Sequence, residues 1–288
     1  MIKIDIQSIH RKLKTYRRSP LSLVLLLLVV SATAITVSVL LFIIGYILVK
    51  GIPNITTDLF AWKYTSENVS LAPAIINTLI IVVLALLIAV PLGIFAAVYL
   101  VEYAKRGNKL VEMIRLTTET LAGIPSIIYG LFGLLFFVTA MGWGFSILAG
   151  AFTLAIMILP VIMRTTEEAL KAVPDSYREG SFALGANKLR TVFRIILPSA
   201  MPGILSGIIL SIGRIVGETA ALLYTAGTVA ETPKNLFSSG RTLSVHMYVL
   251  SSEGLYVNQA YATAVVLLVT VMIINWLSNF LAKKITKG

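Results

Sequence analysis

Two charged residues, Arg214 and Glu218, lie within an otherwise apolar stretch of this 288-residue chain. Their spacing in the segment SIGRIVGETAALLYTAG, residues 211–227, places both side chains on one face of a predicted helix. A charge at membrane depth is costly and usually faces a bundle interior or an aqueous pathway. The planar arginine fork also suits phosphate-like anions. The segment therefore favours an anion pathway, and an ion pair that only joins helices is the alternative.

A second candidate is the polar segment EGSFALGANKLRTVFRIILP, residues 179–198, which lies between two apolar blocks. Pro174 and the acidic residues after it predict a short helix that ends at Gly185, because glycine readily adopts left-handed geometry. A second short helix is expected over 188–196, ended by Pro198. Its apolar side carries Leu189, Val192, Phe193 and Ile196. The pattern predicts two helices joined by a glycine elbow; an amphipathic loop on the membrane surface is the alternative.

Residue types that commonly build enzyme sites are scarce. The two histidines, His10 and His246, are far apart in sequence, and we expect both to be surface residues. The chain contains no Gly-Lys dipeptide, which a phosphate-binding P-loop requires. It has no cysteine, which excludes disulfides and thiolate metal sites. We therefore expect no catalytic residue, metal or cofactor in this chain, and any ATP that drives it must be bound by another chain.

Composition indicates an all-α integral membrane protein. Apolar residues make up 57% of the chain and charged residues 13%, with a mean hydropathy of +0.91. Since about 20 apolar residues cross a bilayer core, the apolar runs predict six transmembrane helices. These cover residues 21–49, 73–100, 121–141, 145–163, 201–224 and 260–282. A cleaved signal peptide is the alternative for the first run, but that run exceeds the usual apolar length of about 7 to 15 residues.

The distribution of basic residues predicts the orientation. Nineteen of the 24 Lys and Arg residues lie in 1–20, 101–120, 164–200 and 283–288, whereas four lie in 50–72 and 225–259. Cytoplasmic segments carry such an excess, so both termini are expected in the cytoplasm. The net charge of +11 then belongs to the cytoplasmic face, where it meets anionic lipids. Nucleic acid is therefore not needed as a partner.

Small residues within the apolar runs predict close packing. Gly123, Gly130 and Gly133 in the third run and Gly150 in the fourth allow helices to approach closely in lipid. Pro91 predicts a kink in the second run. The kink indicates a helix packed in a bundle, and an ordinary kink without functional meaning is the alternative.

The segment 179–198 resembles the EAA loop of binding-protein-dependent ABC importers. That pattern, E-A-A-x3-G-x9-I-x-L-P, is matched by Glu179, Gly185, Ile195, Leu197 and Pro198, while Gly180 and Ser181 replace the two alanines. In that family the loop docks into a groove of the ATP-hydrolysing subunit and transmits its motion to the membrane helices. The resemblance assigns those five residues to ATPase coupling.

Two further stretches are similar to the A-type permease subunit of the phosphate ABC importer. They are GIPSIIYGLFG at 123–133 and the R-x-x-x-E-T-A pattern that begins at Arg214. The resemblance covers residues 73–282 and leaves 21–49 as an extra N-terminal helix. It departs at Ala221, where the family often has proline. It implies that the charged residues Arg214 and Glu218 matter for transport.

The resemblance also implies an architecture and a set of partners. The fold would be that of MetI-like type I importer permeases, with a five-helix core at 73–282 and the coupling loop at 164–200. The partners would be a C-type permease in a heterodimer, two ATP-binding subunits and an external phosphate-binding protein that delivers to 225–259. The location would be the cytoplasmic membrane of a prokaryote. A permease for sulfate or molybdate, or a transporter that needs no ATPase, are the alternatives.

Overall fold

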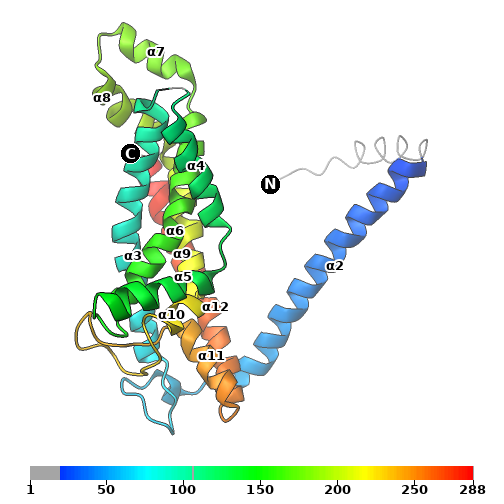
Figure 1. Cartoon of the computed structure of the whole chain (residues 1–288). Helices are drawn as coiled ribbons and strands as arrows, with labels where there is room; N and C mark the ends of the chain where they lie inside the picture. The colour runs from blue at the N-terminus through cyan, green and yellow to red at the C-terminus, as the bar shows by residue number, and fades with distance from the viewer. Residues whose placement is uncertain (1–19, 106, 288) are drawn as a thin grey trace. The chain divides into compact units, whose positions relative to one another are not determined.

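The computed structural model describes residues 20–105 and 107–287, all helical or irregular, with no β-strand in these ranges (Figure 1). The chain divides after Lys50 into two units, Met1–Lys50 and Gly51–Gly288. The first 19 residues of the predicted basic tail, His10 among them, lie outside the described residues.

The first unit is described by the single helix α2, Pro20–Gly51. At a rise of about 1.5 Å per residue, its 32 residues extend about 48 Å, more than the hydrocarbon thickness of a bilayer. Its apolar side chains are exposed around the helix, as expected for a lipid-facing segment. The prediction of an apolar helix over 21–49 is confirmed.

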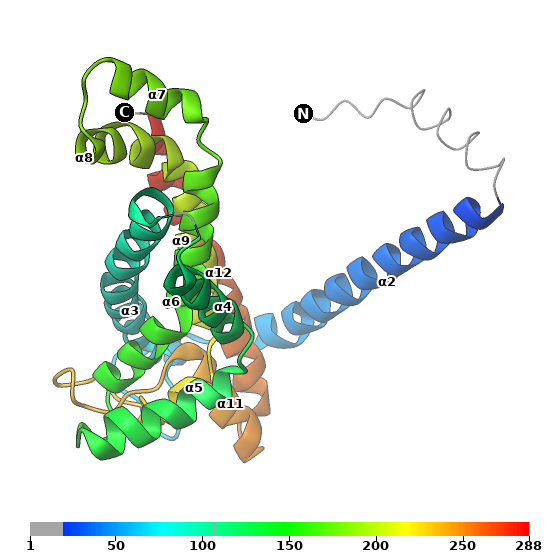
Figure 2. The ribbon, with the colours of Figure 1, turned by 45° about the horizontal axis from the view of Figure 1, so that its top comes forward.

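The second unit is a bundle of four long helices (Figures 1 and 2). They are α3 Ala72–Val98, α6 Ile147–Lys171, α9 Leu197–Gly217 and α12 Val257–Lys287. Helix α6 packs against both α3 and α9. The core between them contains fully buried Ile81, Leu154, Ile158 and Ile162. The bundle supports the predicted all-α membrane fold. Among the described residues five helices, α2 included, are long and apolar enough to cross a bilayer, or six if the bent pair Lys109–Ala122 and Ser126–Ala140 is one span.

Shorter elements close both ends of this bundle. We use "knuckle end" for the end that carries α7 and α8, and "far end" for the end that carries α5, α10 and α11 (Figure 1). Their bounds are η1 Ile52–Asn54, η2 Thr57–Phe60, η3 Tyr99–Tyr103, α7 Asp175–Ala183, α8 Lys188–Thr191, η5 Val192–Ile196, α10 Ala220–Leu223 and α11 Leu243–Glu253.

The third predicted span, residues 121–141, is bent in the structure and begins earlier than predicted. The chain forms α4, Lys109–Ala122, and then α5, Ser126–Gly133, which continues into the π-helical η4, Leu134–Ala140. The two limbs are bent by 102°. Pro125 explains the break, because a proline disfavours helical geometry in the residue before it and cannot donate a backbone hydrogen bond. Figure 2 shows α5 lying across the bundle, so the apolar run makes a broken span.

The predicted glycine contacts are confirmed for three positions. A Cβ on Gly130 would lie 2.8 Å from the Cα of Ala221, and one on Gly133 would meet Thr153 and Thr225. Gly150 similarly faces Leu222 and Ala226. Gly123 instead lies at the break and faces only its own turn. The absence of side chains at these glycines therefore allows α5 to pack closely against α6 and α10.

Helix α6 extends two turns beyond the predicted end at Met163. Two ion pairs at i, i+4 spacing stabilise the added turns. Arg164 Nε lies 3.0 Å from Glu168 Oε1, and Lys171 Nζ lies 2.7 Å from Glu167 Oε1. The prediction that a loop begins at 164 is wrong for this reason.

At the far end, the segment after α10 caps the N-terminus of α6. The first N–H groups of a helix have no partner within it. Here the N–H of Ser146 donates to Thr225 O, that of Ile147 to Ser238 O and that of Leu148 to Leu236 O, over 2.9 to 3.0 Å. The segment is thus part of the packed structure rather than a free loop.

His246, predicted to be a surface residue, is buried in α11. Its ring meets Tyr64 edge-on at 6.2 Å, and the Arg241 guanidinium lies 4.8 Å from the centre of that same Tyr64 ring. Burial, followed by the Arg241 charge, lowers the pKa of His246 to about 3, against a smaller opposing effect of the Val69 backbone. The prediction was wrong because nothing local in the sequence shows that α11 packs against α3 and α12.

Gly133→Ala is expected to destabilise the protein by about 1 to 3 kcal/mol, because the added methyl overpacks the contact with Thr153 and Thr225. The matched control is Gly213→Ala in α9, where no atom lies within 4 Å of the added Cβ. That control should be neutral or stabilising by up to about 1 kcal/mol. Thermal unfolding of the detergent-solubilised protein measures both, and equal transition temperatures would contradict the packing account.

His246 should make stability fall in acid. Its folded pKa lies below its unfolded value of 6.5, so its contribution is complete above pH 6.5 and is lost as pH falls toward 3. The loss is up to about 1.4 kcal/mol per pH unit for one group. His246→Gln should flatten the dependence of the unfolding temperature on pH between 6.5 and 4.5. An unchanged slope would show that other groups govern this range.

Candidate functional site

Arg214 lies in the last turn of α9, half-buried, close to the far end of the bundle. A positive charge is favourable there, because the free carbonyls of a helix C-terminus carry partial negative charge. No carboxylate of the described residues lies within ion-pair distance of its guanidinium. Arg214 is thus a half-buried cation without an ion-pair partner among the described residues.

The prediction that Arg214 and Glu218 share one helix face is wrong. Helix α9 ends at Gly217, and Glu218 has extended backbone geometry, with φ −73° and ψ 128°. Its side chain turns back to α10, where Glu218 Oε1 accepts a 3.1 Å hydrogen bond from the N–H of Ala221. Ser244 Oγ donates to the Glu218 carbonyl over 2.5 Å. Glu218 therefore holds the break together and leaves Arg214 without an intrahelical partner.

Helix α5 packs on α10, next to this break. Tyr129 on α5 is buried, and its hydroxyl donates a 2.8 Å hydrogen bond to Leu121 O. The Arg214 charge acts electrostatically on that hydroxyl. One broken span thus lies against another, and Arg214 lies where α5, α9 and α10 meet.

At the knuckle end, the predicted glycine elbow is present. Helix α7 carries the exposed Glu179 and ends just before Gly185, whose φ of +80° is left-handed. No atom lies within 4 Å of a Cβ added there, so backbone geometry rather than space requires the glycine. Beyond the elbow, the hydroxyls of Ser181 and Thr191 lie 2.8 Å apart and join α7 to α8.

The prediction that Pro198 ends the second short helix is wrong. Helices α8, η5 and α9 follow without a break and form one span, Lys188–Gly217. The π turn η5 ends two residues before Pro198, and such a widened turn accommodates a residue that cannot donate to the helical ladder. Ile195 and Leu197 are half-buried against α3 and α6. The segment after Gly185 is therefore the first part of a membrane helix.

The knuckle presents apolar side chains to its surroundings. The predicted apolar side of the second helix divides, because Val192 and Ile196 are buried whereas Leu189 and Phe193 are exposed. Leu184, beside the elbow, is 90% exposed. The exposed set consists of Tyr177, Phe182, Leu184, Leu189 and Phe193. A cluster of this kind is typical of a surface that another protein covers.

Two arginines with defined partners were not predicted as site residues. Arg178 on α7 is paired with Glu102, 76 positions earlier, and Arg241 lies over Tyr64. Their partners are distant in sequence, so no local spacing indicates either contact.

Comparison with known proteins agrees with this architecture. Residues 89–287 match the family described as binding-protein-dependent transport system inner membrane component. The probable ABC transporter permease protein YqgI of Bacillus subtilis is 35% identical over 275 residues, which cover 88% of this chain and 93% of the relative. The phosphate transport system permease protein PstA of Xylella fastidiosa is 35% identical over 260 residues, covering 85% and 90%.

A solved structure supports the same fold. A chain of the inward-facing MetNI methionine ABC transporter is similar with a TM-score of 0.57 and 19% identity, covering 83% of this chain and 96% of that one. The predicted MetI-like permease fold is thereby confirmed. The chain belongs to the family of binding-protein-dependent transport system inner membrane components.

Proposed function

We propose that this chain is the A-type permease subunit of an ATP-driven importer of inorganic phosphate. The observation that carries the proposal is Arg214, a membrane-depth cation with no ion-pair partner among the described residues, at the end of a broken span. An arginine fork matches tetrahedral oxyanions in charge and geometry. Kinship with a protein named as a phosphate transport permease supports phosphate as the anion.

The proposed pathway passes the breaks in the two spans. Irregular backbone at membrane depth is tolerated where it is buried in protein or lines a water-filled cavity. The break at Gly217 and the bend before α5 both lie near Arg214. A partner permease would supply the other half of the pathway. Glu218 would maintain the shape of the break rather than contact the anion.

Coupling to ATP is proposed at the knuckle. Glu179, Gly185, Ile195, Leu197 and Pro198 match the coupling pattern of importer permeases, and the exposed apolar side chains around Leu184 offer a surface for an ATPase subunit. The excess of Lys and Arg in the basic segments supports a cytoplasmic position for the knuckle and both termini. The membrane would be the cytoplasmic membrane of a prokaryote. This chain would itself be non-catalytic, and two ATP-binding subunits would hydrolyse ATP.

The far end would face an external phosphate-binding protein. The segment 225–259 covers the N-terminus of α6 and contacts α3 through a 3.1 Å hydrogen bond from Asn77 Nδ2 to Arg241 O. A partner that binds this segment would therefore act directly on the main helices of the bundle. Substrate delivery and helix motion would be linked in this way.

Arg214→Gln should reduce ATP-dependent phosphate uptake by about 100-fold or more in the reconstituted complex, because the anion loses a charged hydrogen-bond donor at membrane depth. Arg214→Lys keeps the charge without the fork and should retain intermediate uptake. Arg164→Gln is the matched control, since Arg164 is exposed and paired with Glu168. Native uptake by Arg214→Gln in a fully assembled complex would refute the proposed role.

Gly185→Val should uncouple ATP hydrolysis from uptake, because a β-branched residue is strained at a φ of +80° by roughly 1 to 2 kcal/mol. Gly185→Asn is the conservative variant, since asparagine tolerates left-handed geometry. The measurement is phosphate accumulated per ATP hydrolysed. Equal ratios for Val and Asn variants would show that the elbow geometry does not govern coupling.

A further inference from the structure

Arg178 on α7 has an acceptor for each of its five N–H donors. Its Nε and Nη2 donate to Glu102 Oε1 over 3.2 and 2.7 Å, and Nη2 also donates to Leu170 O over 3.0 Å. Its Nη1 donates to Val173 O over 2.9 Å and to Asp175 Oδ1 over 3.2 Å. This single side chain therefore joins α7 to the end of α6 and to η3, the continuation of α3.

The contact with Glu102 is the shielded part of this set. The side chains of Arg178 and Glu102 are 17% and 8% exposed, whereas that of Asp175 is 80% exposed. A charge pair removed from water is screened far less than an exposed one. Glu102 thus holds Arg178 more firmly than Asp175 does.

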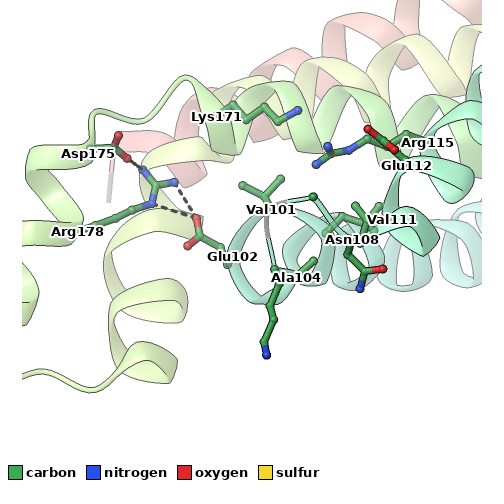
Figure 3. A pocket seen from close by; sticks show the side chains of 13 residues that line it. Val101, Glu102, Ala104, Asn108, Val111, Glu112, Arg115, Lys171, Asp175 and Arg178 are labelled. Atoms are coloured by element: carbon green, nitrogen blue, oxygen red, sulfur yellow. Dashed lines mark hydrogen bonds and ion pairs between the residues drawn. The ribbon is translucent and has the colours of Figure 1, made fainter.

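Arg178 and Glu102 line a cavity of about 480 Å³. Figure 3 shows the pair among the other side chains of the lining. Residues of η3, of the turn after it and of α4 line one side, and Lys171, Asp175 and Arg178 line the other. Of the three further cations of the lining, Arg115 and Lys171 are already paired with Glu167, and Lys105 is exposed. We therefore do not assign the cavity to a ligand. Beside this cavity, the Arg178–Glu102 contact joins α7 to η3.

The chain itself provides a different route out of α7. It continues from the elbow into the span Lys188–Gly217, which contains α9. Movement of α7 therefore reaches α9 along the backbone. The segment after the elbow also touches α3 and η3, through Phe193 on Phe95 and Lys188 over Tyr103. Helix α7 itself contacts η3 through the Arg178–Glu102 pair. Two routes of this kind allow one displaced helix to move two spans together.

We propose that Arg178 is a positioning residue that makes α3 move with α7 when the knuckle is displaced by an ATPase subunit. This rests on the proposed function of the knuckle. Arg178 touches neither the anion nor ATP in this account. It acts by fixing the position of α7 relative to η3, so its loss separates the motion of the knuckle from that of the pathway.

The first test measures coupling in the reconstituted complex with Arg178→Lys and Glu102→Gln. Both should retain the ATPase subunits on co-purification and hydrolyse ATP at near-native rates. Phosphate accumulated per ATP should fall about tenfold, the effect of losing roughly one charged hydrogen bond. Asp175→Asn and Glu168→Gln are the matched controls, because each removes an exposed carboxylate from an arginine pair. Both controls should keep the native ratio.

The second test needs no phosphate. The chain contains no cysteine, so spin labels can be attached through Ser176→Cys on α7 and Lys105→Cys after η3, both at exposed positions. In the native complex, the distance between the labels should stay narrowly distributed with and without ATP. In Arg178→Lys the distribution should broaden or shift when ATP binds.

A native phosphate-to-ATP ratio in both Arg178→Lys and Glu102→Gln, or an unchanged label distance in Arg178→Lys, would overturn the inference. Loss of the ATPase subunits from both variants would also overturn it, since Arg178 would then serve docking. If the native complex takes up no phosphate, the proposed function fails, and the label distance still decides the role of Arg178.

Discussion

Hydrocarbon offers no hydrogen-bond partner to a free backbone N–H or C=O, and the architecture of this protein depends on that constraint. Long helices satisfy their own backbone groups, but two spans are broken, before α5 and after Gly217. The breaks lie against each other, with glycines allowing α5 to approach α10 closely. At the break after Gly217 the Glu218 side chain accepts from the Ala221 N–H, and at the bend before α5 the Tyr129 hydroxyl donates to Leu121 O. Two of the proposed functional residues, Arg214 and Gly185, therefore lie at or just after the end of a helix.

Three partly or fully buried arginines differ in the groups that surround their positive charge. Arg178 has five hydrogen bonds and a carboxylate, and Arg241 lies over an aromatic ring. Arg214 has neither and lies in the last turn of α9, at a helix C-terminus. The shielded Arg178–Glu102 pair is screened less than an exposed pair, so it is suited to fix the position of α7 relative to η3. The unpaired charge of Arg214 is the feature on which the proposed anion pathway rests.

Much of this could be predicted from the sequence, and the misses have physical causes. Apolar runs predict the helices, and the glycine between two amphipathic stretches predicts the left-handed elbow at Gly185. The bend before α5 was missed because the apolar run continues through Pro125, although that proline is its visible signal. The end of α9 before Glu218, the burial of His246 and the Arg178–Glu102 pair depend on packing between distant segments. Periodicity within one segment carries no information about such contacts.

The most direct test of the central claim is uptake of radiolabelled phosphate by liposomes that contain this chain, its partner permease and the ATPase subunits, with the binding protein outside. The account predicts that phosphate accumulates only when ATP and the ATPase subunits are present, and that excess sulfate or molybdate leaves uptake unchanged. Uptake without the ATPase subunits, or equal inhibition by sulfate or molybdate, would contradict it.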